Sequence, residues 1–204
     1  ICYASWRIKS INAHANIIVA PSDHIIADLE KFNYAIEESL LFAAETDAIV
    51  TLGIHPTHPE TGYGYIQADL SYSSSRNSNI FRVDSFTEKP SLEVAEGYLK
   101  KKNYLWNSGI FIWNVSTIVN AFRVYQPEMC KKFESVMPYF GTEREQEHID
   151  CIYPQCENIS VDYAILERAG EVFVFPATFG WSDLGTWGSL RTQIGQDQYG
   201  NAAI

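Results

Sequence analysis

Apolar and polar positions along the chain follow two periods, which predict strands and helices in alternation. Residues 17–20 (IIVA) are an apolar run that stops at Pro21, as expected of a buried strand. From Asp28 to about Glu45, apolar residues recur every three or four positions, which predicts an amphipathic helix with Asp28 as its N-cap. Residues 47–54 are the next apolar run. This strand–helix–strand order is a βαβ unit and predicts a parallel sheet with helices on its faces.

The rest of the chain predicts more elements of both kinds. Residues 71–79 are polar and predict an exposed turn, and the alternating residues 80–86 predict a half-buried strand. Ser91 is placed to cap a helix that runs to Lys102. Residues 106–113 predict a loop that enters a buried strand. The remaining expected elements are helices at 115–125, 128–136 and 161–169, a charged surface stretch at 141–150 and a strand at 171–175.

The composition is that of one folded domain with an acidic surface. Of the 204 residues, 46% are hydrophobic and 20% are charged, as in ordinary globular proteins. Acidic residues outnumber basic ones by 25 to 15, which gives a formal net charge of −10. Because nucleic-acid binding relies on Lys and Arg, we expect no nucleic-acid partner. No apolar run approaches the roughly 20 residues that cross a bilayer, so we expect no membrane partner.

The cysteines and the two ends of the chain add information about its context. Four cysteines, at positions 2, 130, 151 and 156, are too few and too scattered for a disulfide scaffold. We therefore expect reduced thiols in a cytoplasmic protein. The first residue is Ile1 rather than Met, and the last residues resemble no natural terminus. These ends suggest a piece of a longer protein.

Two aspartates that follow predicted strands are candidate metal ligands. Asp23 comes directly after the first strand, and Asp183 lies between Gly180 and Gly185. In an open parallel sheet, ligands bind beyond the carboxyl ends of the strands. Mg²⁺ takes oxygen ligands, usually one or two carboxylates together with phosphate oxygens. The alternative for each aspartate is that it caps a helix or a turn.

Three further segments offer groups that suit a sugar phosphate. Glu88 is an acceptor for sugar hydroxyls, and Lys89 beside it can hold a phosphate as a point charge. Gly62 and Gly64 lack Cβ atoms, which permits a ligand to approach the backbone closely. Residues 107–109 (NSG) offer amide and hydroxyl groups. The alternatives for these segments are a solvated ion pair, an ordinary turn and an Asx-type turn.

Six motifs in a fixed order together resemble the sugar-phosphate nucleotidyltransferases, and among them the bacterial mannose-1-phosphate guanylyltransferases (GDP-mannose pyrophosphorylases). They are residues 21–26 (PSDHII), 53–66 (GIHPTHPETGYGYI), 86–90 (FTEKP), 106–113 (WNSGIFIW), 160–167 (SVDYAILE) and 180–187 (GWSDLGTW). The resemblance runs from about residue 17 to 187. It implies an α/β, Rossmann-like nucleotidyltransferase fold with a mixed, mostly parallel sheet and helices on both faces.

The resemblance also implies an activity and a set of site residues. The implied reaction joins GTP to α-D-mannose 1-phosphate and gives GDP-mannose and pyrophosphate, with Mg²⁺ as cofactor. Positioning of the substrates and neutralisation of their charge would suffice for catalysis, because the sugar phosphate is already a nucleophile and needs no general base. The implied catalytic residues are Asp23, Lys89 and Asp183, of which the two aspartates hold the metal. The resemblance implies that Glu88 and Asn107 bind mannose hydroxyls and that Lys89 binds the sugar phosphate. Gly64 and Asp162 are the other implied substrate-binding residues.

The chain departs from the family at both ends. Family members begin with a strand and a Gly-rich loop that cradles the triphosphate, and they continue into a further C-terminal domain. This sequence has no such loop, so we expect residues 1–190 to be a partial nucleotidyltransferase domain and 191–204 the start of a linker. The 204-residue piece alone is expected to be inactive or nearly so, and to aggregate through the unpaired edge of its sheet.

Two alternative functions stay open. The first is a nucleotidyltransferase for another hexose 1-phosphate or nucleotide, because base choice depends mostly on the loop that this sequence lacks. The second is a non-catalytic protein that binds a sugar phosphate, although the presence of both aspartates and of the Glu-Lys pair argues against it. A homo-oligomer is compatible with each of these functions.

Overall fold

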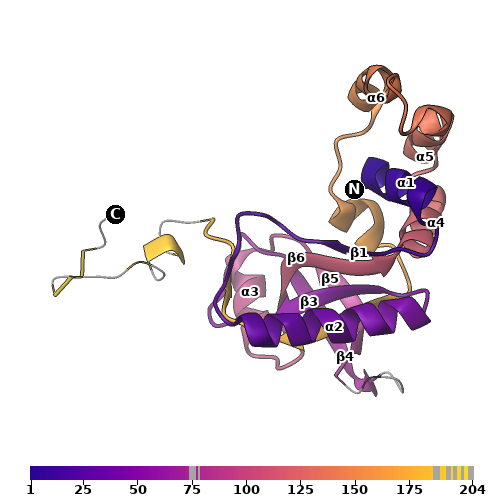
Figure 1. Ribbon diagram of the computed structural model, residues 1–204. Coiled ribbons are helices and arrows are strands. Elements are labelled where there is room, and N and C mark those ends of the chain that lie inside the picture. The colour runs from indigo at the N-terminus through magenta and orange to yellow at the C-terminus, as the bar shows by residue number, and fades with distance from the viewer. Residues whose placement is uncertain are drawn as a thin grey trace.

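A six-stranded mixed sheet forms the centre of the molecule, with helices on both of its faces (Figure 1). This computed structural model describes residues 1–73, 77, 79–185, 189–191, 194, 197, 198, 200 and 201. In spatial order the strands are β1 (Asn16–Val19), β6 (Tyr104–Asn114), β3 (Ile49–Ile54), β7 (Val172–Ala177), β5 (Phe81–Thr87) and β4 (Tyr65–Ser73). The expected α/β class, with a Rossmann-like sheet covered on both faces, is confirmed.

The prediction of a mostly parallel sheet is wrong. Among the strands of the described residues, only β3 and β7 pair in parallel, and every other pair is antiparallel. β1 and β3 point in the same direction, as a βαβ unit requires, but β6 lies between them and runs antiparallel to both. The cause is the apolar run of β6, in which Ile112 and Trp113 have no exposed surface. A strand that is buried on both faces takes an interior position in the sheet, with a neighbour on each side.

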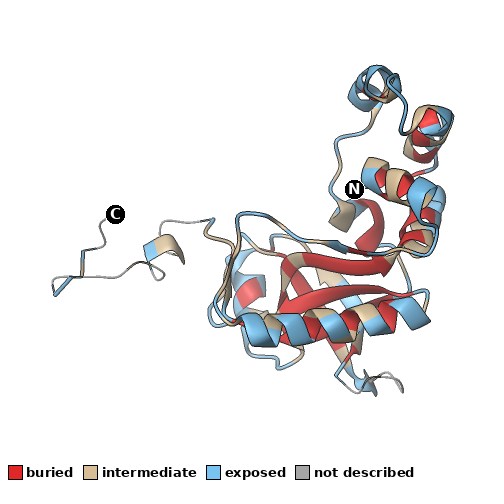
Figure 2. Ribbon diagram, viewed as in Figure 1, coloured by how far each residue is buried: buried red, intermediate tan, exposed pale blue. Residues whose placement is uncertain are grey.

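One face of the sheet is covered by α2 (Leu29–Glu45), as predicted (Figure 2). The helix begins where Asp28 accepts a hydrogen bond from the backbone N–H of Lys31 at 3.0 Å. Its buried residues, among them Ala35 and Phe42, pack against β3, β6 and β7. The segment between β1 and this helix carries Asp23 and the short strand β2 (Ile25–Ile26).

On the opposite face, four helices and one π-helical turn share a single apolar core with residues of β1, β3, β6 and β7. The helices are α1 (Cys2–Ile11), α4 (Val115–Tyr125), α5 (Pro127–Val136) and α6 (Glu145–Ile152), and the turn is η3 (Asp162–Leu166). α4 and α5 match the predicted helices, whereas η3 is shorter than the expected helix at 161–169. α1 was not predicted, and α6 replaces the expected charged surface stretch. Both were missed because each buries few residues: Cys2, Ser5 and Trp6 in α1, and Ile149 in α6.

Smaller elements complete the described structure. α3 (Leu92–Leu99) starts after the Ser91 cap as predicted but ends before the three lysines that were expected to belong to it. β2 (Ile25–Ile26) and β8 (Trp181–Ser182) form a separate antiparallel pair, and η1 (Met137–Tyr139) and η2 (Tyr153–Gln155) are short 3₁₀ turns. All four cysteines are free thiols. No helix in the described ranges combines the length and the apolar character needed to cross a bilayer.

Candidate active site

The small β2–β8 ladder brings the two candidate metal ligands to one place. Ile25 pairs with Ser182 and Ile26 with Trp181. Because the pairing is antiparallel, Asp23 precedes β2 and Asp183 follows β8 at the same end of the ladder. Asp23 is exposed, and among the described residues its carboxylate has no hydrogen-bond partner. The structure therefore places both aspartates where the chain leaves the carboxyl ends of β1 and β7.

The Asp183 carboxylate is held through one of its two oxygens. Its Oδ1 accepts a hydrogen bond from the Tyr63 hydroxyl at 2.5 Å and another from the backbone N–H of Gly185 at 3.0 Å. Within the described part of the chain, Oδ2 accepts none. Thr186 and Trp187, which complete the last predicted motif, lie outside the described residues. One oriented carboxylate with a free oxygen is a suitable ligand for a cation.

The side chains around the two aspartates determine which metal ion could bind there. The described residues contain no group of three or more His, Cys, Asp or Glu side chains placed to hold a metal ion. Zinc in proteins usually takes three or four such ligands. Mg²⁺ instead binds one or two carboxylates and keeps water and substrate phosphate as its other ligands. The pair Asp23 and Asp183 fits that second pattern.

Glu88 and Lys89 lie in the turn that follows β5. The Lys89 ammonium is 3.6 Å from Glu88 Oε1, and 66% of the Lys89 side chain is exposed, against 16% for Glu88. Lys89 has a φ of +47°, a left-handed conformation that is rare for any residue except glycine. Its backbone N–H donates to the Tyr63 carbonyl at 3.3 Å. Such strain is typical of functional sites, where it persists because the surrounding structure fixes it.

Glycine is required at position 64 because the side chains of Glu88 and Asn107 lie very close to its backbone. A Cβ atom at this position would collide with Oε2 of Glu88 and would lie 3.4 Å from the Cβ of Asn107. The carbonyl of Gly64 also accepts a hydrogen bond from the backbone N–H of Asn107 at 2.8 Å. These contacts lie within the protein, and the close approach of a ligand to this backbone stays a prediction. They show that the glycine allows the Glu88 carboxylate to pack beside β6.

Asn107 and Asp162 form the third side of this cluster. The Asn107 side-chain amide donates to Oδ1 of Asp162 at 2.8 Å, and its oxygen accepts from the backbone N–H of Gly109 at 3.1 Å. Asp162 opens η3, and π-helical turns are rare and frequently occur at functional sites. Asn107 is therefore committed in part to orienting Asp162, in addition to the hydroxyl-binding role expected for it.

The expected loop at the start of 106–113 is in fact part of a strand. β6 is continuous from Tyr104 to Asn114 and contains a bulge, because four steps along β6 from Asn107 to Phe111 oppose two steps along β3. Gly109 has a φ of +72° within this bulge. A β-bulge re-aims side chains and is common next to active sites. The polar Asn107 can therefore reach the site from a strand that is otherwise apolar.

Two neighbouring carboxyl groups determine the electrostatics of the cluster. Burial raises the pKa of Glu88, and the negative charge of Asp162 raises it further. Burial also raises the pKa of Asp162, against the opposing effect of its hydrogen bond from Asn107 and the charge of Lys89. The folded protein therefore favours the protonated form of both carboxyl groups more than free side chains would.

Asp162→Asn is expected to stabilise the protein at neutral pH and to do so less in acid. The folded-state pKa of Asp162 is raised, so its ionised form opposes folding, and this opposition appears as the pH rises above the ordinary value of 3.8. The variant keeps the Asn107 hydrogen bond but loses the charge. Thermal unfolding at about pH 4 and pH 7 should give a larger difference in Tm at the higher pH. A constant difference would contradict this assignment.

Tyr63 is the site residue that the sequence analysis missed. Its ring lies edge-on to Trp106 and to Trp181, with centroid separations of 5.2 Å in both cases. The hydrogen bond from Trp181 Nε1 to His24 Nδ1 at 3.1 Å gives His24 a structural role beside it. Tyr63 belongs to one of the six motifs, but no local pattern shows that its hydroxyl reaches a carboxylate 120 positions further along the chain.

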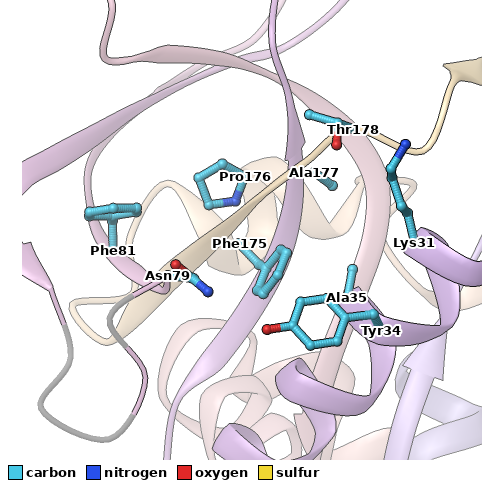
Figure 3. Close-up of a pocket in the computed structure, with 9 residues that line it drawn as sticks. All are labelled: Lys31, Tyr34, Ala35, Asn79, Phe81, Phe175, Pro176, Ala177 and Thr178. Atoms are coloured by element: carbon cyan, nitrogen blue, oxygen red, sulfur yellow. The ribbon is translucent and has the colours of Figure 1, made fainter.

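Two cavities lie on different sides of the described structure. One of about 310 Å³ lies between α2 and β7, with Tyr34, Phe81 and Phe175 among its lining residues (Figure 3). Its Lys31 is ion-paired with Asp28 at 2.8 Å, and no candidate site residue lines it. The other, of about 560 Å³, lies among α1, α5 and the segment 153–164, and Asp162 lines it. Of the expected site residues, only Asp162 lines this larger cavity.

Comparisons with known proteins agree with the fold and the motifs. A family model described as nucleotidyl transferase matches residues 1–198. A mannose-1-phosphate guanylyltransferase of Escherichia coli is 33% identical over 98% of this chain and 44% of its own length. One of Salmonella montevideo is 36% identical over 95% of this chain and 41% of its own length.

A solved structure extends this similarity to three dimensions. A protein of Thermus thermophilus, described as mannose-1-phosphate geranyltransferase, is 32% identical and superposes with a TM-score of 0.79. That match covers 96% of this chain and 55% of the other protein. The chain thus spans less than half the length of the two bacterial relatives and little more than half of the solved protein.

Proposed function

The chain belongs to the nucleotidyl transferase family, and from this we propose that the whole protein makes GDP-mannose and pyrophosphate from GTP and α-D-mannose 1-phosphate. The observation that carries the proposal is the polar cluster of Gly64, Glu88, Lys89, Asn107 and Asp162, which Tyr63 connects to Asp183. Relatives that are described as mannose-1-phosphate guanylyltransferases support the choice of mannose and guanine.

The chemistry proposed for this site is an in-line displacement at phosphorus. An oxygen of the sugar phosphate attacks the α-phosphorus of GTP, a new P–O bond forms, and the bond to pyrophosphate breaks with its electron pair. No side chain has to remove a proton, because the attacking phosphate oxygen is already anionic. The contribution of the protein is to position the two phosphates and to offset their charge.

Each residue of the cluster has a place in this proposal. Glu88 accepts hydrogen bonds from sugar hydroxyls, and the exposed Lys89 ammonium holds the sugar phosphate. Asn107 shares its amide between the sugar and Asp162. Gly64 leaves the room in which the Glu88 carboxylate lies.

Asp23 and Asp183 would hold the proposed Mg²⁺. The ion, when bound, supplies positive charge to the phosphate oxygens. Asp183 offers the oxygen that accepts no hydrogen bond from the described residues, and Asp23 offers an exposed carboxylate at the same end of the β2–β8 ladder. This arrangement allows an acidic protein to bind two anionic substrates.

The test is an assay of the whole protein with GTP, mannose 1-phosphate and Mg²⁺. Release of pyrophosphate together with GDP-mannose, identified by mass spectrometry, is the expected result. Glucose 1-phosphate, and UTP or ATP in place of GTP, are the matched alternatives and should react at least tenfold more slowly. Faster turnover of one of them would overturn the choice of substrate. Binding of mannose 1-phosphate without turnover would overturn the proposed reaction.

A further inference from the structure

We propose that Tyr63 is a positioning residue, which orients the Asp183 carboxylate for the cation and ties it to the phosphate-binding turn at Lys89. The inference rests on the proposed function, because it assigns a cation to Asp183. The observations that carry it are the two hydrogen bonds of Tyr63, one from its side chain and one to its backbone.

The first observation is that the donors around Asp183 select one oxygen. The Tyr63 hydroxyl and the backbone N–H of Gly185 both donate to Oδ1, at 2.5 and 3.0 Å. A Cβ at position 185 would lie 2.6 Å from Oδ2, so the glycine keeps space open beside that oxygen. Carboxylates that bind metals are usually oriented by such hydrogen bonds. Here two donors fix the carboxylate plane and leave Oδ2 for the cation.

The second observation is that the Tyr63 ring cannot easily rotate away from Asp183. It packs edge-on to Trp106 on β6 and to Trp181 on β8. Trp106 is itself buried, with 5% of its surface exposed. Because two large rings hold the phenol, its hydroxyl is fixed before any ligand arrives. A hydrogen bond fixed in this way costs little further ordering when the cation binds.

The third observation is that Tyr63 connects the two halves of the site. Its carbonyl accepts the hydrogen bond from the backbone N–H of Lys89 at 3.3 Å, while its hydroxyl donates to Asp183. One residue therefore sets the relative place of a metal-binding carboxylate and a phosphate-binding turn. In-line transfer depends on that relative placement, since the sugar phosphate and the triphosphate must meet end to end.

The experiment compares Tyr63→Phe with Tyr3→Phe in the whole protein. Tyr63→Phe keeps the ring between the two tryptophans and the backbone bond to Lys89, and it removes only the hydroxyl. Tyr3→Phe is the matched control, because the Tyr3 hydroxyl also donates to a carboxylate, that of Glu145 at 2.7 Å, on the helical side of the molecule. Binding of Mn²⁺ alone is followed by the loss of the electron paramagnetic resonance signal of the free ion.

Tyr63→Phe is expected to weaken Mn²⁺ binding about tenfold, the lower end of the range for lost partners of metal ligands. The Mg²⁺ concentration for half-maximal turnover should rise by a similar factor, while KM for mannose 1-phosphate at saturating Mg²⁺ changes less than about twofold. Tyr3→Phe should change none of these quantities. Tyr63→Ala, which also removes the ring, should raise KM for the sugar phosphate as well.

The possible outcomes separate this inference from the proposed function. If the unsubstituted protein turns over and binds Mn²⁺, and Tyr63→Phe binds it equally well, the positioning role is wrong and the proposed function stands. If a purely structural role is correct, Tyr63→Phe lowers Tm and leaves the dissociation constant for Mn²⁺ unchanged. If the unsubstituted protein binds no Mn²⁺, the metal assignment to Asp183 fails, and the role of Tyr63 fails with it.

Discussion

Asp183→Asn is expected to lower kcat/KM for sugar-nucleotide formation by about 1,000-fold, or about 4 kcal/mol in transition-state stabilisation. The change is nearly isosteric. The asparagine carbonyl can still accept from the Tyr63 hydroxyl and from the N–H of Gly185, so the fold should keep its stability. What is lost is the negative charge that holds the proposed cation against the phosphates. Steady-state kinetics at several Mg²⁺ concentrations measure the effect.

The matched control for this substitution is Asp28→Asn. Asp28 caps α2, and asparagine caps helices about as well as aspartate, so neither Tm nor turnover should change appreciably. Partial recovery of Asp183→Asn at high Mg²⁺ would agree with weakened metal binding. Full turnover of this variant at low Mg²⁺ would contradict the assignment of Asp183.

Lys89→Gly is expected to cause the second largest loss of activity. It should do so without lowering the stability of the fold. Loss of the ammonium removes a charged contact to the sugar phosphate, for which we expect about a 100-fold fall in kcat/KM. The same change removes backbone strain, because glycine adopts the left-handed φ of +47° freely, whereas this conformation costs an ordinary residue about 1 kcal/mol or more. Part of that gain is lost again to the freedom of glycine in the unfolded chain. Chemical denaturation should therefore show equal or slightly higher stability.

Two comparisons make this prediction specific to position 89. Lys89→Ala removes the same charge but keeps the strained backbone, so activity should fall equally without any gain in stability. Lys131→Gly, in the regular helix α5, should lower the free energy of unfolding by about 1 kcal/mol and leave activity unchanged. A large loss of stability in Lys89→Gly would show that the turn is not strained.

The elements that the sequence predicts well are those with local signals at their ends. The Asp28 cap marks the start of α2. Pro127 separates the two helices predicted at 115–125 and 128–136, and in the structure it is the first residue of α5. The apolar run of β6 indicates a strand that is buried on both faces, but no local signal shows that its neighbours are β1 and β3. The bulge around Gly109 has none either, since it exists only relative to β3.

The candidate site shows the same division between local and long-range information. The motifs name Glu88, Asn107 and Asp162, and the structure places these three side chains together. The Asn107–Asp162 bond and the role of Tyr63 arise from segments far apart in sequence. Short β2 and β8 strands, which place Asp23 and Asp183 at one end of a ladder, are too brief to give an apolar pattern. Residue types were therefore predictable, and their partners were not.

The position of β6 next to the edge strand β1 has a consequence for the order of events during synthesis. β1 pairs only with β6 among the described strands, yet β1 ends at Val19 and β6 begins at Tyr104. At about 5 to 20 residues per second, a ribosome needs roughly 4 to 17 seconds to make the chain between them. During that interval β1 has emerged without its partner strand, and the nascent chain presents apolar surface to chaperones. The sheet is complete only after β7, which lies between β3 and β5 and ends at Ala177, has also left the exit tunnel.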